Sequence, residues 1–334
     1  MSYIEIQNVR KSFGDHEVLR DVSLSIEEHE FVSFLGSSGC GKTTLLRCIV
    51  GLESIDSGRI FLDGRDITHV PPQQRGISMI FQQYCLFPTM NLYNNVSFGL
   101  RMQKLPKAEI KDRVEKVLDI VNMREHINKY PYQMSGGEQQ RAALARALIM
   151  NPKVLLLDEP FSAIDAKLRK DLQVYLKEIH KQFGMTSIFV THDQEEAMRM
   201  SDRIHLFNQG ILEQSDSPYE IYARPRTPFV ASFIGSYNLF TAEEARVLFG
   251  TEKITAIRPE LLRLSDAPEP GEESLSFAGT IVNEIPQGSI IRYVVRSASG
   301  IECKVDELFT SDSHRSVGDE VTVCLFKKDL IIYE

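Results

Sequence analysis

The sequence predicts an α/β domain with a largely parallel sheet, followed by a small all-β domain, an OB-like barrel or a sandwich. In the first part of the chain, short apolar runs typical of buried strands alternate with segments that carry apolar residues at helical spacing. This alternation is typical of a parallel sheet covered by helices. Toward the end, short strand-like runs follow one another between glycine and polar turns. The 334 residues suffice for two compact domains.

The elements of the first domain are expected in a regular order. Alternating or continuous apolar runs predict strands at 3–6, 22–26, 31–35, 154–157 and 187–191. Apolar residues three or four positions apart predict helices at 43–50, 107–127, 136–150 and 165–182.

A change of composition near residue 216 marks the end of the first domain. Three prolines, at 218, 225 and 228, punctuate a connecting segment that continues to about Phe240. We therefore expect one domain at 1–238, with its linker beginning at about 216, and a second domain at 239–334. Strands of the second domain are expected at 254–257, 277–284, 290–295, 301–305, 320–326 and 330–333.

Charge and composition exclude several classes of protein. Residues 241–334 carry 17 acidic and 10 basic side chains, whereas the first 240 residues are nearly neutral and the whole chain has a net charge of −8. A nucleic-acid-binding protein needs a basic face, so no nucleic-acid partner is expected. The five cysteines form no CxxC pair, which indicates neither a disulfide framework nor a zinc site. Because no apolar run is long enough to span a bilayer and no signal peptide is recognisable, a cytoplasmic protein is expected.

A phosphate-binding loop is the first chemical motif. Residues 36–43 (GSSGCGKT) fit the Walker A pattern G-x-x-x-x-G-K-[ST]. The glycines let backbone N–H groups turn toward phosphates, Lys42 supplies a positive charge, and the Thr43 hydroxyl is placed to coordinate Mg²⁺. An apolar strand before the loop and a helix after it argue against a chance match in a turn.

A pair of carboxylates is the second motif. Residues 154–159 (VLLLDE) read as a buried strand that ends in two acids. Asp158 is placed to accept hydrogen bonds from the water shell of a metal ion, and Glu159 is placed to polarise an attacking water. The alternative is a core strand followed by ordinary surface acids, and the presence of a Walker A loop argues against it.

Four further segments, in their order along the chain, determine the family. Gln82 ends the run 80–82 (IFQ), and residues 134–141 (MSGGEQQR) resemble the signature sequence of ABC ATPases. Residues 162–165 (SAID) and 191–193 (THD) resemble the D-loop and H-loop of the same family. With the Walker A loop and residues 154–159, which resemble the family's Walker B motif, six motifs stand in the family's order within residues 1–215. The chain is thus identified as a member of the ABC ATPases, which implies an α/β P-loop fold with a helical subdomain.

The resemblance implies a site for ATP and Mg²⁺. It assigns catalytic roles to Glu159, His192, Gln82 and Lys42. It assigns contacts with ATP to Phe13, Gly36, Ser37, Ser38, Gly39, Cys40, Gly41, Lys42, Thr43, Thr44, Gln82, Ser135, Gly136, Gly137, Asp165 and His192. It assigns the metal ion to Thr43, Gln82 and Asp158.

The site that the resemblance implies is shared between two chains. Ser135 and Gly137 would bind the γ-phosphate of ATP held by the partner subunit, and Asp165 would cross the dimer interface. Phe13 would stack on adenine, although an exposed aromatic residue in a hairpin turn is the alternative; for His192 the alternative is a structural histidine. Met134, Glu138 and Ile164 depart from the usual Leu, Gln and Leu, but none of these departures changes a phosphate-binding atom.

The end of the chain resembles importer ATPases. The segments 217–222 (SPYEIY), 229–235 (FVASFIG) and 257–260 (IRPE) resemble the linker and accessory β-domain of bacterial importer ATPases for sugars, polyamines, ferric iron, sulfate and phosphonates. This resemblance implies a homodimer at the cytoplasmic face of the plasma membrane, two membrane permease subunits and an extracytoplasmic substrate-binding protein. Ferric iron, a polyamine or a phosphonate is the expected cargo.

Two readings from other classes remain beside the importer. A stand-alone regulatory or DNA-associated ATPase could use the same cassette, but the acidic tail argues against it, as does the missing coiled-coil insertion between Walker A and the signature. A small-molecule P-loop kinase would give no role to the signature or to Gln82.

Overall fold

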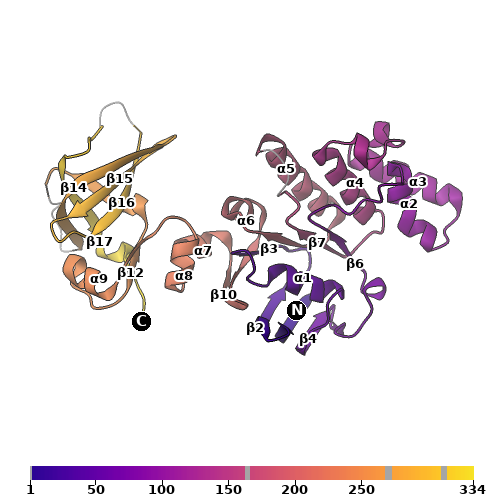
Figure 1. Cartoon of the computed structure of the whole chain (residues 1–334), viewed down its shortest axis with the longest axis horizontal. Coiled ribbons are helices and arrows are strands. Elements are labelled where there is room, and N and C mark those ends of the chain that lie inside the picture. The colour runs from indigo at the N-terminus through magenta and orange to yellow at the C-terminus, as the bar shows by residue number, and fades with distance from the viewer. Residues whose placement is uncertain (1, 162–165, 268–272, 310–313) are drawn as a thin grey trace. The chain divides into compact units, whose positions relative to one another are not determined.

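The computed structural model describes residues 2–161, 166–267, 273–309 and 314–334 (Figure 1). The chain divides into two compact units, Met1–Pro218 and Tyr219–Glu334. The boundary falls within the segment in which the sequence shows its change of composition. None of the helices in the described ranges combines the length and the apolar character needed to cross a membrane.

The first unit is built on a six-stranded sheet whose order is β10-β9-β3-β8-β7-β6. All neighbouring strands are parallel except β10, which pairs antiparallel with β9. The strands are β3 (Phe31–Gly36), β6 (Ile77–Ile80), β7 (Val154–Asp158), β8 (Thr186–Thr191), β9 (Arg203–Asn208) and β10 (Ile211–Asp216). The apolar runs of the sequence predicted β3, β7 and β8, whereas β6, β9 and β10 were not predicted.

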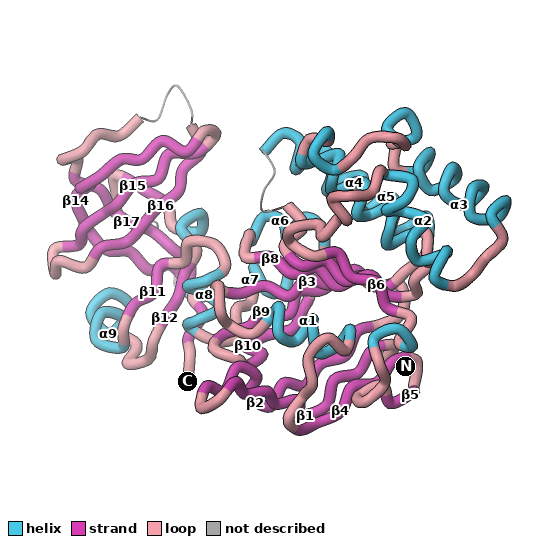
Figure 2. Tube along the Cα trace, turned by 45° about the vertical axis from the view of Figure 1, so that its right-hand side comes forward, coloured by secondary structure: helices cyan, strands magenta, loops and turns pink. Residues whose placement is uncertain are grey.

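Both faces of this sheet are covered, which explains why its central strands are apolar throughout. Alternate residues of a strand point to opposite faces. Leu155 therefore belongs to the core beneath α4 (Gly136–Leu148) and α5 (Ala166–Phe183), while Val154 belongs to the core that contains α1 (Lys42–Val50). The tube view shows α4 and α5 on one side of the strands and α1 on the other (Figure 2).

A second, antiparallel sheet packs with α1 in the same core. Its order is β2-β1-β4-β5. The strands are β1 (Ile4–Phe13), β2 (His16–Ile26), β4 (Ser57–Leu62) and β5 (Arg65–Asp66).

Three helices form a helical subdomain on the face of the six-stranded sheet opposite α1. They are α2 (Leu92–Met102), α3 (Lys107–Ile120) and α4. The helix α2 was not predicted; its first turn is capped by the Asn91 side chain, which accepts a hydrogen bond from the Asn94 N–H. The helix predicted at 107–127 was too long. It ends at Ile120, because Asn122 takes a left-handed conformation (φ 52°) and the chain continues in a short 3₁₀ turn at Arg124–His126.

The second unit contains two sheets, ordered β11-β12-β18 and β13-β17-β14-β15-β16. Their strands are β11 (Asn238–Phe240), β12 (Thr255–Ile257), β13 (Arg263–Ser265), β14 (Ser274–Gln287), β15 (Ile290–Ser297), β16 (Glu302–Leu308), β17 (Glu320–Phe326) and β18 (Ile331–Ile332). The predicted all-β architecture is confirmed for the described residues that follow the connecting segment, with one α-helix added. This helix, α9 (Ala242–Phe249), begins with a capping box between Thr241 and Glu244.

The connecting segment, in which the sequence places three prolines, has regular secondary structure. It forms two short helices, α7 (Pro218–Ala223) and α8 (Pro228–Phe233). Each begins with its proline, which is favourable because the first helical N–H has no partner within the helix.

A buried histidine gives the first unit a pH-dependent stability. His205 of β9 is 1% exposed, its ring lies edge-on to Phe34, and neither ring nitrogen has a hydrogen-bond partner within the described ranges. Burial lowers the pKa of His205 to about 3. The unfolded chain therefore takes up a proton near pH 6.5 that the folded chain excludes. The contribution of His205 to stability is present above pH 6.5 and falls by about 2 kcal/mol between pH 6.5 and pH 5.0.

Replacing this histidine by leucine is expected to reduce the loss of stability on acidification. Calorimetry of the first unit's unfolding transition at pH 7.5 and pH 5.0 measures the difference. Burial also lowers the pKa of His180, so part of the pH dependence of stability should remain in the variant. The matched control is His69→Asn at an exposed histidine, which should leave the pH dependence unchanged. An unaltered pH dependence in His205→Leu would contradict the assignment.

Candidate active site

The Walker A loop connects β3 to α1 and needs glycine at defined positions. Gly36 has a φ of 150°, and a Cβ atom there would lie 2.3 Å from the carbonyl oxygen of Phe207. Gly41 caps α1 in a left-handed conformation (φ 101°). Lys42 is only 5% exposed, and its Nζ donates to the carbonyl oxygens of Gly36 and Ser37 at 2.8 Å each. The loop therefore holds a buried cation at the N-terminus of a helix, where an anion binds favourably.

The residues between these glycines differ in accessibility. Ser37, Ser38 and Gly39 are exposed and so are open to a ligand. Cys40 is 3% exposed, and its Sγ lies 3.5 Å from Lys42 Nζ. Thr44 is half-buried in the first turn of α1.

Thr43 and Asp158 are in contact at the carboxyl end of the parallel strands. The Thr43 hydroxyl donates to Asp158 Oδ1 at 2.8 Å, although 115 residues separate the two in the chain. Burial raises the pKa of Asp158 from its ordinary value, and the hydrogen bond from Thr43 opposes this shift. A cation bound here would favour the ionised carboxylate. The structure thus brings together two of the three predicted metal ligands.

The three predicted catalytic side chains at the ends of β6, β7 and β8 also meet. Gln82 Nε2 donates to Glu159 Oε2 at 3.3 Å, and His192 Nδ1 lies 3.4 Å from Glu159 Oε1. Glu159 has a positive φ of 44°, and its N–H donates to the carbonyl oxygen of Val190. Carboxyl ends of parallel strands lie at one edge of a sheet, so residues from three segments converge around one carboxylate.

The hydrogen bonds made by the residues on either side of His192 were not predicted from the sequence. The Thr191 hydroxyl donates to Glu196 Oε2 at 2.7 Å and accepts from the Asp193 N–H at 3.0 Å. Asp193 in turn caps α6 (Gln194–Met200). Arg169 of α5 reaches Asp193 and Glu196 at 3.6 and 3.8 Å. The sequence signal for this network was the capping residue just before a helix.

The signature residues begin α4, the helix on the opposite face of the sheet from α1. Ser135 caps α4: its Oγ accepts from the Glu138 N–H, and Glu138 Oε2 accepts from the Ser135 N–H at 2.7 Å. That hydrogen bond to the Ser135 N–H lowers the pKa of Glu138. The unusual glutamate therefore completes a capping box. Gly136, which follows the cap, is exposed, whereas Gly137 is buried.

Phe13, a predicted nucleotide contact, lies in the antiparallel sheet. Phe13 ends β1 at the hairpin to β2, is 49% exposed, and has Lys11 Nζ 5.0 Å from its ring centre. Lys11 itself pairs with Glu53 at 3.0 Å. Asp165 lies outside the described residues.

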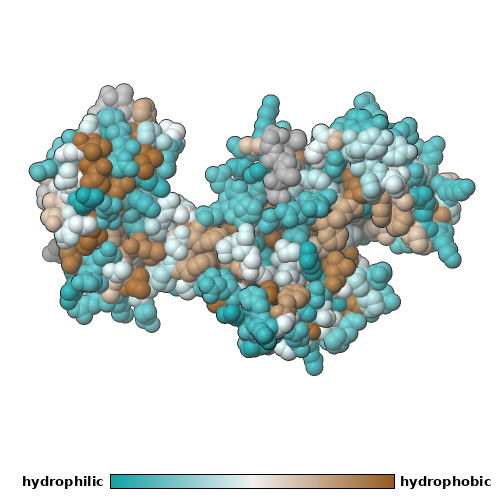
Figure 3. Space-filling model, viewed as in Figure 1, coloured by the Kyte–Doolittle hydropathy of each residue, from teal (hydrophilic) through white to brown (hydrophobic). Residues whose placement is uncertain are grey.

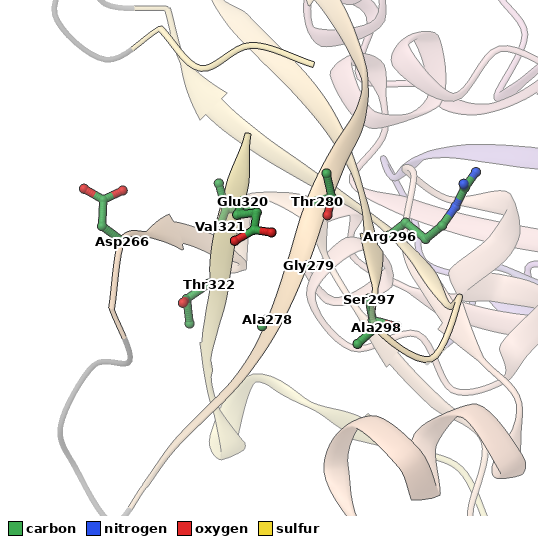
Figure 4. A pocket seen from close by; sticks show the side chains of 10 residues that line it. All are labelled: Asp266, Ala278, Gly279, Thr280, Arg296, Ser297, Ala298, Glu320, Val321 and Thr322. Atoms are coloured by element: carbon green, nitrogen blue, oxygen red, sulfur yellow. The ribbon is translucent and has the colours of Figure 1, made fainter. Parts of the chain in front are cut away.

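A cavity lies in the second unit. It has a volume of about 410 Å³ and lies over β14, β15 and β17 (Figure 4). The side chains of Asp266, Thr280, Arg296 and Glu320 are among those that line it. The phosphate-binding loop and the convergent carboxylate described above belong to the first unit.

Comparison with known proteins agrees with this geometry. A family model described as "ABC transporter" matches residues 19–162, and one described as "TOBE domain" matches residues 255–332. A "Spermidine/putrescine import ATP-binding protein PotA" of Vibrio vulnificus (strain YJ016) is 42% identical over 346 residues, which cover 96% of this chain and 91% of the relative. The chain belongs to the ABC transporter family. It is an ABC importer ATPase with a C-terminal accessory domain.

Other relatives and solved structures agree with this assignment. The protein of the same name from Haemophilus influenzae (strain ATCC 51907 / DSM 11121 / KW20 / Rd) is 44% identical, covering 96% of this ABC ATPase and 93% of the relative. Among solved structures, "cbiO1 from clostridium perfringens: Part of the ABC transporter complex cbiONQ" matches with a TM-score of 0.63 and 29% identity, covering 67% of this chain and 91% of that chain. The "ATP-binding cassette MJ0796 bound to ADP and Pi", a dimeric post-hydrolysis state, matches with a TM-score of 0.59 and 31% identity, over 64% and 98%.

Proposed function

We propose that this chain is the ATP-hydrolysing subunit of a polyamine importer and that it works as a homodimer with two membrane permease subunits. The observation that carries the proposal is 42–44% identity, over 96% of this chain, to proteins named for spermidine and putrescine import. Among the three expected cargoes, this observation favours a polyamine over ferric iron or a phosphonate. An extracytoplasmic binding protein would deliver the polyamine, and the ATPase would lie at the cytoplasmic face of the membrane.

Lys42 is proposed to bind the β- and γ-phosphates of ATP. Its ammonium group is held by two neutral carbonyl oxygens of the loop, as described above. Phosphate oxygens are stronger acceptors because they are charged, so they would replace these carbonyls when ATP binds. Backbone N–H groups at the start of α1 would complete the anion site.

The residues at the beginning of α1 and at the end of β7 are suited to bind a magnesium ion. Thr43 offers a hydroxyl and Asp158 a carboxylate, both hard oxygen donors, and their side chains are already in contact. Gln82 would add an amide oxygen, and phosphate oxygens and water would complete the coordination. When bound, the ion would neutralise part of the negative charge of the phosphates.

Glu159 is proposed to act as the general base. Its carboxylate would accept a proton from the water whose oxygen attacks the γ-phosphorus, and ADP would leave. Gln82 and His192 contact different oxygens of this carboxylate, which fixes its orientation. Orientation of a base toward its water is a large part of its catalytic effect.

A complete site is proposed to need two chains. Ser135, Gly136 and Gly137 lie at the beginning of a 13-residue helix, where backbone N–H groups and the helix dipole favour an anion. We assign this anion site to the γ-phosphate of ATP bound by the partner's Walker A loop, with Asp165 at the interface.

The coupling segment, residues 83–98, is proposed to dock the permease. In the space-filling view, apolar surface is exposed around α2 and β6 (Figure 3). Within the segment, Phe87 is 36% exposed and its ring lies 4.8 Å from that of Phe98. Exposed apolar surface of this kind suits a partner protein.

Uptake of labelled polyamine tests the proposal. In its own host, loss of this chain is expected to reduce the initial rate of spermidine or putrescine uptake at least about tenfold. The native chain should restore uptake and a Glu159→Gln chain should not, while ferric iron and phosphonate uptake remain unchanged. Unimpaired polyamine uptake would overturn the assigned cargo.

Copurification tests the alternative class of function. The importer proposal requires that membrane permease subunits copurify with the chain. A stand-alone regulatory or DNA-associated ATPase would instead copurify with DNA, and its loss would leave transport intact.

A further inference from the structure

The loop between β6 and α2 contains two residues in an unfavourable backbone conformation. Tyr84 has a φ of 58° and Cys85 a φ of 47°. Residues with a side chain rarely adopt this left-handed region, and two in succession persist only where surrounding contacts hold them. These two residues come two and three positions after Gln82, which contacts the catalytic carboxylate, and they lie within the coupling segment.

Two contacts anchor the ends of the loop. The Tyr84 side chain is 6% exposed, and its hydroxyl donates to the carbonyl oxygen of Pro160, the residue after Glu159. At the far end, the Asn95 side chain of α2 accepts from the Phe87 N–H at 2.8 Å and donates to the Phe87 carbonyl at 3.1 Å. The first anchor joins the loop to the catalytic strand end, and the second joins it to the helical subdomain.

A third contact comes from the signature helix and holds the strained residues themselves. Arg146 of α4 donates from one guanidinium nitrogen to the Cys85 carbonyl at 2.7 Å and from the other to the Tyr84 carbonyl at 3.0 Å. Its guanidinium carbon also lies 5.6 Å from the centre of the Phe87 ring. Charged donors form strong hydrogen bonds, and the planar fork of arginine can serve two carbonyls at once.

We propose that Arg146 is a positioning residue that couples the signature helix to the coupling segment. This inference rests on the proposed function, in which Ser135, at the N-terminus of the same helix, binds the partner's ATP. A movement of α4 as it engages that ATP would pull on both carbonyls held by Arg146. The side chain thus connects the nucleotide sites to the surface that docks the permease, and it touches neither nucleotide nor substrate.

The thiol of Cys85 provides a direct reporter of the loop. Cys85 is exposed, whereas Cys40, Cys48, Cys303 and Cys324 are buried. The rate at which the folded full chain reacts with 5,5′-dithiobis(2-nitrobenzoate) therefore reports on Cys85, and a Cys85→Ser variant verifies the origin of the signal. In Arg146→Ala the released loop is expected to react at least about fivefold faster.

The conservative variant separates positioning from bulk packing. Lysine keeps the charge but acts as a point donor and cannot serve both carbonyls in the arginine geometry. Arg146→Lys should therefore react faster than the native chain, at a rate between those of the native and alanine proteins. The matched control is Arg113→Ala, which removes an exposed arginine paired with Glu109 on α3 and should leave the Cys85 rate unchanged.

The coupling itself is measured by adding ATP with Mg²⁺. ATP is expected to change the Cys85 rate in the native chain, and Arg146→Ala should lose most of this change while its Kd for ATP stays within about twofold. A native Cys85 rate and a native response to ATP in folded Arg146→Ala would overturn the proposal. Where that variant does not fold, a native rate and response in Arg146→Lys overturn it equally. Neither measurement depends on the cargo, so failure of polyamine import and failure of this coupling are distinguishable.

Discussion

Glu159→Gln is expected to slow ATP hydrolysis at least about 100-fold while the Kd for ATP stays within about threefold. The amide cannot accept a proton from the attacking water, whereas Lys42 and Thr43 still hold the phosphates and the metal ion. Gln82 and His192 lose their charged partner but remain in place. Steady-state release of phosphate by the purified chain, together with equilibrium binding of ATP, measures both quantities. The variant should also accumulate as a closed dimer with ATP and Mg²⁺.

A nearby carboxylate provides the control for Glu159. Glu195 lies exposed in the first turn of α6, three residues after His192. Glu195→Gln removes the same charge from a carboxylate three residues from His192, and this variant should hydrolyse ATP at nearly the native rate. Turnover of Glu159→Gln within about threefold of native would remove Glu159 from the role of general base.

The central part of the site was predictable because it depends on local sequence. A glycine-rich loop between an apolar strand and a helix has one geometry that cradles phosphate, and a buried strand that ends in two acids places them at the sheet edge. The contact between Thr43 and Asp158 follows from these two motifs once β3 and β7 run parallel in one sheet, with β8 between them. The same reasoning brings Glu159 near His192.

The remaining features depend on contacts between distant segments, which a single sequence does not display. The role of Arg146 cannot be inferred from an arginine in a helix, because its partners are backbone carbonyls of a loop about 60 residues away. Glu138 was recognised only as a departure from the family pattern, and the structure reveals it as the second half of a capping box. The helix α9 was missed although Thr241 and Glu244 carry the same signal, because strand-like runs surround it.

The second large effect concerns a site shared between two chains. Lys42→Ala removes the phosphate-binding cation, and Ser135→Arg places a bulky charged side chain at the start of α4. In each mutant homodimer both sites carry a defect, so each is expected to retain less than about 2% of native hydrolysis. In a dimer of one chain of each kind, one site carries both defects and the other carries neither. Random exchange of chains yields such dimers half of the time, so the mixture should recover at most about a quarter of native turnover.

The control for this experiment places both defects in one chain. A Lys42→Ala, Ser135→Arg double variant mixed with Lys42→Ala contains no intact Walker A loop, so no combination of chains can rebuild a site and activity should stay at the level of either protein alone. The expected result is recovery of ATP hydrolysis in the first mixture and no recovery in the second. This result requires that Ser135 of one chain act on ATP held by Lys42 of the other, because no arrangement within a single chain gives it. Full activity of Ser135→Arg alone would exclude the shared site. So would the absence of recovery in a mixture whose chains are shown to have exchanged.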